Sequence, residues 1–164
     1  MRTLDAGWQL CEALWTSRLH DLESFVGIES RYNLLDRSIE RELVLCCQAY
    51  GIGVVPWGPL AGGFLTGRYL PGQEIPADVH LSNFPSLYGD VPTDANFDRL
   101  AKLEAFAKEL GHRVGGLPVA WLLSHAWVGS VIAGATSMQQ LSANVIAAGW
   151  RLAREDIDRS EEIL

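Results

Sequence analysis

The residues with the clearest chemical potential lie between positions 53 and 69, where an aromatic ring precedes a glycine-rich turn. Residues 53–55 predict a short buried strand, and Pro56 is expected to end its pairing because proline has no N–H to donate. Trp57 then stands at the carboxyl end of the strand, before a turn whose backbone can approach a ligand closely. Ligands bind at such strand ends in α/β folds, although a buried tryptophan followed by an ordinary turn explains the same residues.

A second stretch with chemical potential joins three small residues, Gly134, Ala135 and Thr136, to a predicted helix. The first N–H groups of that helix have no partner within it, so an anion could bind there. It would gain charge-assisted hydrogen bonds and about 0.3–1 kcal/mol from the helix dipole. Gln140 and Asn144 lie one turn apart on one helical face. The stretch predicts an anion site, although the N-terminus of a packing helix would need the same residues.

The composition is that of a soluble globular protein with one domain or less. The chain has 164 residues and a formal net charge of -7, which argues against nucleic acid as a partner. We find neither a signal-peptide pattern nor an apolar run long enough to span a membrane. The three cysteines (Cys11, Cys46 and Cys47) have neither an even count nor zinc-site spacing. We therefore expect a reduced, cytoplasmic setting, no disulfide and no metal site.

Helices and strands are expected to alternate around these stretches. Helical spacing over residues 8–16 places Trp8 and Trp15 on an apolar face, as core residues. Residues 25–28 predict a short strand that ends just before Glu29. The next helix is expected to begin at a Ser38 cap and to end at a Gly51 cap. Its inward side chains are predicted to be Leu43, Cys46, Cys47 and Tyr50.

The second half of the chain begins with its least regular part. Residues 70–95 contain four prolines and no clear period, which predicts a long loop able to cover a bound molecule. Residues 98–110 predict an amphipathic helix, and a further helix is expected to end near residue 125. A strand is expected at residues 130–133. Two more helices are predicted, over residues 138–148 and 153–164.

Three segments together resemble the aldo/keto reductase family. The stretch that begins W-G-P-L-A at Trp57 and ends L-T-G-R-Y is similar to the family's W-S-P-L-A-x-G…L-T-G-K-Y after barrel strand seven. Residues 32–37, Y-N-L-L-D-R, resemble its strand-six exit. Residues 134–144 resemble its G-A-S-x-x-x-Q-L-x-x-N signature after strand eight. The resemblance implies an α/β fold, the incomplete C-terminal half of a (β/α)8 TIM barrel, with residues 1–164 forming a partial domain of strand–helix units five to eight plus a C-terminal helix.

The resemblance also implies that NADP(H) is bound by these residues. Trp57 would stack on the nicotinamide ring, and Arg68 could reach a phosphate bidentately. In the branch that contains the potassium-channel β subunits, residues matching Thr136, Gln140 and Asn144 hold the adenosine 2′-phosphate and adenine. The full cofactor-binding set implied by the resemblance is Glu29, Trp57, Gly58, Pro59, Leu60, Ala61, Gly62, Arg68, Gly134, Ala135, Thr136, Gln140 and Asn144.

Two features depart from the family pattern. Where the family has a glutamine that hydrogen-bonds the nicotinamide carboxamide, this sequence has Glu29. A carboxylate can accept from the amide but cannot donate to its oxygen, so Glu29 either binds the cofactor less well or serves another purpose. Ala143 replaces an acid of the branch, and the segment lacks the Lys or Arg that many relatives place near the 2′-phosphate. The preference for NADPH over NADH therefore stays open.

The family passes a hydride from the cofactor to an aldehyde or ketone, using a Tyr acid with Lys, Asp and His partners. The resemblance places all four in the first half of the barrel, so no catalytic residue is expected in this chain. We interpret it as the cofactor-binding half of an NADP-dependent aldo/keto reductase, truncated and not catalytic alone. Its expected partners are the dinucleotide and either a missing N-terminal half or a second copy, not nucleic acid or membrane. A non-catalytic nicotinamide-nucleotide-binding regulatory module, or a fragment without function alone, are the alternatives.

Overall fold

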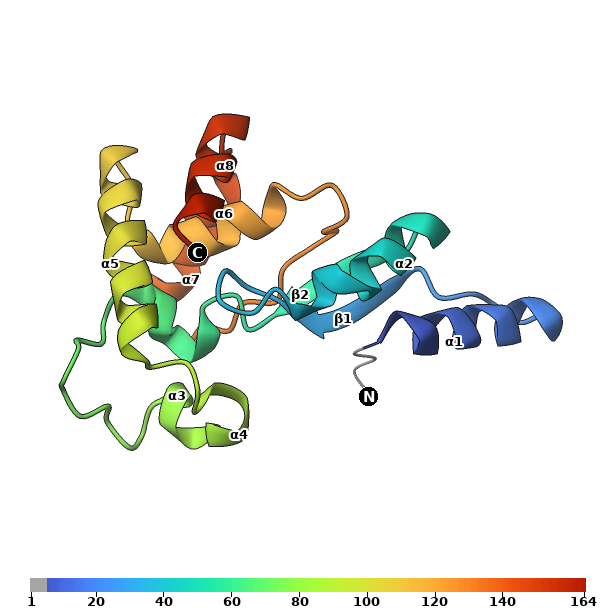
Figure 1. Ribbon diagram of the computed structural model, residues 1–164, viewed down its shortest axis with the longest axis horizontal. Coiled ribbons are helices and arrows are strands. Elements are labelled where there is room, and N and C mark those ends of the chain that lie inside the picture. Colours follow the sequence, from blue (N-terminus) through green and yellow to red (C-terminus); the bar gives the residue numbers. More distant parts are fainter. Residues whose placement is uncertain (1–5) are drawn as a thin grey trace.

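The computed structural model describes residues 6–164 as a mixed α/β chain (Figure 1). Within these residues, no helix has the length and apolar character that crossing a membrane requires. In chain order the elements are α1 (Gly7–Leu19), β1 (Gly27–Arg31), η1 (Ser38–Arg41), α2 (Leu43–Tyr50), β2 (Gly53–Trp57), η2 (Ala61–Thr66), α3 (His80–Asn83), α4 (Pro85–Tyr88), α5 (Asp94–Glu109), η3 (Val114–Gly116), α6 (Leu117–Leu123), α7 (Met138–Gly149) and α8 (Arg154–Glu162), where η marks a 3-10 helix.

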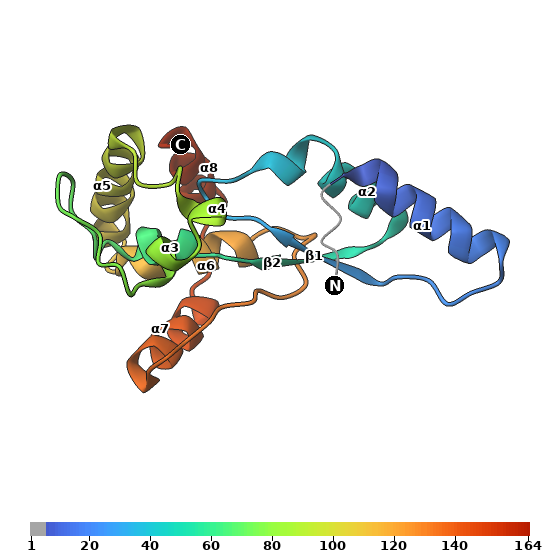
Figure 2. The same ribbon diagram turned by 90° about the horizontal axis from the view of Figure 1, so that it is seen from below.

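The sheet is organised around β2. β1 pairs with one edge of β2 in parallel, from Gly27 opposite Gly53 to Arg31 opposite Trp57. α1 and α2 lie on one side of these strands, while α7 projects on the other side (Figure 2). The sheet therefore has one face covered by helices and one face that is more open.

The other edge of β2 pairs with residues 127–132, but only through isolated bridges. Val54 bridges Val128 and Trp57 bridges Ile132, both in parallel. The span from Val128 to Ile132 is one residue longer than the span from Val54 to Trp57, so one residue has no opposite number, as in a bulge. The regular strand predicted at residues 130–133 is therefore not formed, although its segment lies where a third strand would.

α1 buries a different face from the one predicted. Leu10 and Leu14 are buried one turn apart, whereas Trp8 is 60% exposed and Trp15 is 47% exposed. The prediction that both tryptophans are core residues is wrong, because α1 packs on α2 through the stripe that contains the leucines. The Trp15 indole donates to the Tyr50 hydroxyl at 3.2 Å. Tyr50 is exposed as well, which corrects its predicted inward position.

The buried face of α2 and its C-terminal end agree with the prediction, apart from Tyr50. Leu43, Cys46 and Cys47 are buried. Gly51 adopts a left-handed φ of 68° and donates its N–H to the Cys47 carbonyl, which ends the helix. Its start differs, because Ser38 opens a separate 3-10 turn and α2 itself begins only at Leu43.

The later helices largely follow the predicted pattern. α5 begins earlier than expected, since the Thr93 hydroxyl accepts the Asn96 N–H at 3.2 Å and caps it. Gly111, with a φ of 77°, follows its end. α6, α7 and α8 lie within a few residues of their predicted ranges.

A partly buried polar cluster joins the exit of β1 to the C-terminal helices. The fully buried Tyr32 donates its hydroxyl to Glu40 at 2.6 Å, and burial together with this carboxylate raises the pKa of Tyr32. Arg37 donates to the same carboxylate at 2.7 Å and lies 3.4 Å from Glu161 of α8. Its guanidinium also stands 5.2 Å from the centre of the Trp121 ring of α6. The Arg37 guanidinium, paired with Glu40, thus links the chain after β1 to two distant helices.

His125 makes the stability of this region depend on pH. Burial lowers the pKa of His125, although its Nδ1 lies 2.8 Å from the Trp121 carbonyl. Below about pH 6.5 the unfolded chain therefore binds a proton that the folded chain resists, and stability falls. We expect the free energy of unfolding to decrease from pH 7 to pH 5, and His125→Gln to reduce this decrease in urea titrations at both pH values.

The matched control is His20→Gln, at an exposed position after α1. It should leave the pH dependence unchanged. Asp36 affects stability in a different pH range. Despite its burial, hydrogen bonds from Ser38 and the charge of Arg31 lower the pKa of Asp36 below 3.8. Its stabilising contribution is therefore lost only at pH values more acidic than those of this test. An unaltered slope between pH 7 and 5 in His125→Gln would contradict the prediction.

Candidate functional site

The candidate site begins on the more open face of β1 and β2. Side chains alternate along both strands: Ile28 and Ser30 of β1 are buried, whereas Glu29 and Arg31 are half-buried. The same alternation leaves Trp57 half-buried at the end of β2. Glu29 lies inside β1 and not after it, which corrects its predicted place, because pairing with β2 continues to Arg31. The structure therefore puts Glu29 and Trp57 on one face of adjacent strands.

Pairing also continues through Pro56, where it was expected to stop. A proline lacks only the donor, and the Pro56 carbonyl still accepts the Ile132 N–H at 2.8 Å. Trp57 consequently forms the last pair of the strand, opposite Arg31 on one side and bridged to Ile132 on the other. Both neighbours fix the direction in which the chain leaves β2.

The turn after Trp57 has the backbone geometry that its glycines predict. Gly58 and Gly62 have φ values of 67° and 68°, and Ala61 is held at 47°, which is unusual for a residue with a Cβ atom. The Ala61 N–H donates to the Gly58 carbonyl at 3.0 Å. One N–H that was expected to face a phosphate is therefore used within the turn. Pro59 is buried and Leu60 is half-buried.

Asn33 holds this turn in place. Its side chain, only 2% exposed, donates Nδ2 to the Gly58 carbonyl at 3.0 Å. Its Oδ1 accepts the N–H groups of Leu35 and Asp36, each at 3.0 Å. Only an amide can donate and accept in this way, so neither Asp nor Leu could replace it. Sequence reasoning assigned Asn33 no role, although it lies within the Y-N-L-L-D-R segment.

The segment predicted as a long loop, residues 70–95, contains α3 and α4, which pack on the same turn. Leu81 and Tyr88 are both 3% exposed, and a Cβ atom added at Gly62 would lie 3.1 Å from each. Glycine is therefore required at position 62 for its φ and for this close packing. The segment is thus not the irregular loop that was predicted, because it contains two short helices that pack on the glycine-rich turn (Figure 1). That it covers a bound molecule stays a prediction.

Arg31 fastens α4 to the end of β1. Its Nε donates to Asp36 at 2.5 Å, and its Nη1 donates to the Leu87 carbonyl. Because both groups are partly buried, these charge-assisted bonds contribute more than an exposed ion pair would. Arg31 was not among the predicted site residues, although the two-residue alternation places it beside Glu29.

The second predicted stretch forms an exposed cluster at the start of α7. Gln140 Oε1 accepts both the N–H and the hydroxyl of Thr136, at 2.7 and 3.1 Å. The Asn144 amide lies 3.4 Å from the Gly134 carbonyl, which it can reach as a donor. Ser137, and not Thr136, caps the helix by accepting the Gln140 N–H at 3.2 Å. The polar groups predicted to act together therefore lie together, with Ala135 among them, and they are bonded to one another.

Arg68, predicted to reach a phosphate, lies against residues of the glycine-rich turn itself. Its exposed guanidinium lies 4.8 Å from the centre of the Tyr69 ring. It also covers Gly63, where an added Cβ atom would be 2.5 Å from Arg68 Nη2.

The two stretches begin at neighbouring strand ends. Ile132 bridges Trp57, so Gly134 follows two residues beyond that bridge. α7 projects from the sheet (Figure 2), with Gln140 bonded to Thr136 and Asn144 beside the Gly134 carbonyl. Trp57, residues 58–62 and Gly134 therefore gather at one end of the sheet, with the Asn144 amide of α7 beside Gly134, whereas Glu29 lies in the middle of β1 on the same face as Trp57.

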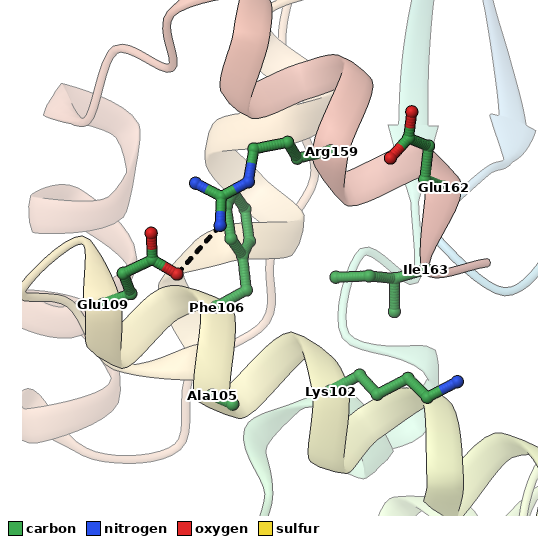
Figure 3. Close-up of a pocket in the computed structure, with 7 residues that line it drawn as sticks. All are labelled: Lys102, Ala105, Phe106, Glu109, Arg159, Glu162 and Ile163. Carbon is green, nitrogen blue, oxygen red and sulfur yellow. Dashed lines mark hydrogen bonds and ion pairs between the residues drawn. The ribbon is translucent and has the colours of Figure 1, made fainter.

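A groove between α5 and α8 lies outside this set of residues (Figure 3). Arg159 crosses it, donating to Glu109 at 2.8 Å and lying 4.8 Å from the centre of the Phe106 ring. The groove contains none of the predicted site residues. Within residues 6–164, no three His, Cys, Asp or Glu side chains form a group that could hold a metal ion.

The sequence matches the aldo/keto reductase family over residues 6–164. The chain belongs to the aldo/keto reductase family. It is 34% identical over 161 residues to the probable voltage-gated potassium channel subunit beta of Oryza sativa subsp. japonica, covering 95% of this chain and 49% of that protein. The corresponding protein of Arabidopsis thaliana is 33% identical over 159 residues, 88% of this chain and 48% of that protein.

A relative with a named reductase activity is also similar. L-glyceraldehyde 3-phosphate reductase of Escherichia coli (strain K12) is 36% identical over 121 residues, 71% of this chain and 34% of that protein. The prediction that this chain belongs to the aldo/keto reductase family is thus confirmed. The chain spans about half the length of the curated relatives it matches.

Arg31→Met should release α4 from the sheet. The variant keeps the length of the side chain but removes the donors to Leu87 and Asp36, so the α3–α4 segment should open more often. We expect faster chymotrypsin cleavage within residues 70–93, where Phe84 is exposed, with a loss of about 1–2 kcal/mol in unfolding free energy. Arg68→Met, which removes a guanidinium from the turn itself, is the control. Equal cleavage rates in wild type and Arg31→Met would show that Arg31 does not hold α4.

Proposed function

We propose that this chain is the C-terminal, cofactor-binding half of an NADP-dependent aldo/keto reductase. The observation that carries the proposal is the position of Trp57. It lies half-buried at the end of β2, opposite Arg31 and on the same face as Glu29, directly before a turn with positive φ angles. An aromatic ring, a polar side chain and a tight backbone turn at one end of a parallel sheet are what a nicotinamide dinucleotide requires.

Each group would serve a different part of the dinucleotide. Trp57 would stack on the nicotinamide, and Glu29 would accept from its carboxamide. The backbone of Gly58 to Gly62 would face the pyrophosphate, with the Ala61 N–H excluded by its bond to Gly58. Thr136, Gln140 and Asn144 would face the adenosine end, where Gln140 would exchange its bonds with Thr136 for bonds to the ligand.

The proposed cofactor and the residues of this chain would have different roles in the reaction. When bound, the cofactor supplies the hydride that reduces an aldehyde or ketone. The residues of this chain bind and orient it, and the stack on Trp57 would be worth about 0.5–1.5 kcal/mol beyond area burial. We assign no proton donor for the carbonyl oxygen to this chain, because the resemblance places that acid in the first half of the barrel.

The parallel pairing of β1 with β2 supports a further part of the proposal, namely that residues 1–164 form strand–helix units of a (β/α)8 barrel. Among the described residues, β1 pairs only along the edge it shares with β2. Its other edge and the open face with Glu29 and Trp57 would meet the rest of a closed barrel, supplied either by an N-terminal half or by a second copy. An exposed strand edge is a favourable site for such pairing.

A second candidate is a regulatory module that binds the dinucleotide without turnover. The observation that favours it is the similarity to proteins named as channel subunits. Oxidation of NADPH in the presence of a panel of aldehydes separates the two functions. Turnover by the chain with its proposed other half supports the reductase, whereas tight binding without turnover in that complex supports the module.

Trp57 provides the direct test of the site. If the indole stacks on nicotinamide, NADPH should quench part of the tryptophan fluorescence, and Trp57→Ala should abolish that part. The lost stack should also raise Kd about two- to twelvefold. Trp15→Ala, on the exposed face of α1, is the control and should reduce only the background of the other tryptophans. Identical quenching amplitude in Trp57→Ala would remove Trp57 from the site.

Glu29→Gln tests the nicotinamide end. Among residues 6–164, the Glu29 carboxylate has no hydrogen bond or ion pair, so the substitution should change binding more than folding. An amide can both donate to and accept from the carboxamide, and we expect Kd for NADPH to fall about two- to tenfold in titration calorimetry. Glu23→Gln, an exposed change before β1, should have no effect. Weaker binding in Glu29→Gln would mean that the carboxylate makes a favourable contact of its own.

A further inference from the structure

Two of the three cysteines face each other across the interface between α1 and α2. Cys11 Sγ lies 3.0 Å from Cys46 Sγ, although 35 positions separate them in the chain. A disulfide bond is about 2.05 Å long, so the sulfur atoms need to approach by roughly 1 Å. Among residues 6–164, no comparable sulfur contact involves Cys47, whose side chain is fully buried. The sequence spacing gave no sign of this pair.

The helices are held at this point by contacts on either side of the pair. One turn before Cys11, the Trp8 N–H donates to the Glu42 carboxylate at 2.9 Å. One turn after it, the Trp15 indole donates to the Tyr50 hydroxyl at 3.2 Å. These bonds fix the separation and register of α1 and α2. The two sulfur atoms are therefore held close together by the packing of the helices.

The two thiols differ in access to solvent. Cys11 is half-buried at the surface of α1, whereas Cys46 is 9% exposed. Burial and the contact with Cys11 raise the pKa of Cys46 to about 12, so this thiol is poorly ionised at neutral pH. A small oxidant would therefore meet Cys11 first, with Cys46 positioned to resolve the product.

We propose that Cys11 and Cys46 form a redox modification site, in which a peroxide drives an intramolecular disulfide between α1 and α2. In the first step the Cys11 sulfur attacks hydrogen peroxide, which gives a sulfenic acid and one water. In the second step the Cys46 sulfur attacks the Cys11 sulfur, the S–O bond breaks, and a second water leaves. Two thiols are oxidised by two electrons, and one peroxide is reduced to two waters. A dithiol reductant reverses the reaction.

The disulfide would fix α1, whose attachment to the chain is otherwise limited. α1 contacts α2, while Trp8, Trp15 and Leu19 are exposed, and the connection to β1 over residues 20–26 is exposed throughout. Closing the loop between positions 11 and 46 restricts the unfolded chain more than the folded one. The oxidised form should therefore be the more stable one, independently of any cofactor.

The test uses the purified full chain, first reduced and then treated with hydrogen peroxide. Alkylation after denaturation should modify three cysteines in the reduced protein and one after oxidation, with a monomeric mass that is lower by two hydrogens. Trypsin should release the peptide 3–18 linked to the peptide 42–68. The melting temperature should rise by about 5–10 °C and return to its first value with a dithiol reductant.

Single variants identify the pair. Cys47→Ala should still lose two alkylation sites on oxidation, whereas Cys11→Ala and Cys46→Ala should lose none. Three modifiable thiols in wild type, under peroxide that oxidises a free thiol peptide, would overturn the proposal. A disulfide that persists in Cys11→Ala, or one that links two copies of the chain, would also overturn it. Because the wild-type measurement needs no variant, a poorly folded variant does not prevent the test.

Discussion

The main-chain hydrogen bonding of β2 is the constraint on which the rest of the structure depends. On one edge, β2 pairs in register with β1; on the other, Val54 and Pro56 exchange hydrogen bonds of 2.8–2.9 Å with the segment from Trp127 to Ile132. These bonds bring together the ends of β1, of β2 and of the bridged segment 128–132, which are far apart in the chain. Residues that leave those ends therefore start from one place, whatever path they take afterwards.

Polar side chains then set the path after the strand ends. Asn33 bonds the Gly58 carbonyl, and Arg31 bonds the Leu87 carbonyl, so both act on backbone groups that an apolar side chain could not hold. Loss of the Arg31 side chain would remove the donor that the Leu87 carbonyl has in this structure, whereas the Gly58 carbonyl would keep the Ala61 N–H and lose its link to Asn33. The turn and its two covering helices consequently depend on a few side chains at the end of β1.

Apolar exposure separates the helices into two kinds. α2, α5 and α6 bury a continuous face, whereas α7 exposes Met138, Val145 and Ile146 and buries only Ala147. α7 contacts α6 and η3, where Trp150 and Ala147 lie close to Gly116. α1 likewise exposes its tryptophans. If the proposed barrel is correct, these faces are where a further segment would gain most from apolar burial.

Local patterns in the sequence determined the longer helices, some of their ends and the turn chemistry. Sequence patterns predicted α5 to α8 within a few residues and the end of α2, although α2 begins only at Leu43 and α3 and α4 were predicted as loop. Gly51, Gly58 and Gly62 adopt the positive φ angles that glycine allows. The motifs of residues 32–37, 57–69 and 134–144 together predicted the family, since each reflects a local path of the chain where it leaves a predicted strand. These properties depend on neighbours within a few positions.

Only the tertiary structure decided which side chains meet and which face of each element is buried. Trp8 and Trp15 have the spacing of a core stripe, yet α1 packs through Leu10 and Leu14, because the position of α2 selects the face. Pro56 stays within β2 because the partner on that side is a donor, Ile132. Asn33 and Gly58, or Cys11 and Cys46, come into contact through pairings across 25 and 35 positions. Such contacts follow from the packing of distant elements, which a local pattern does not specify.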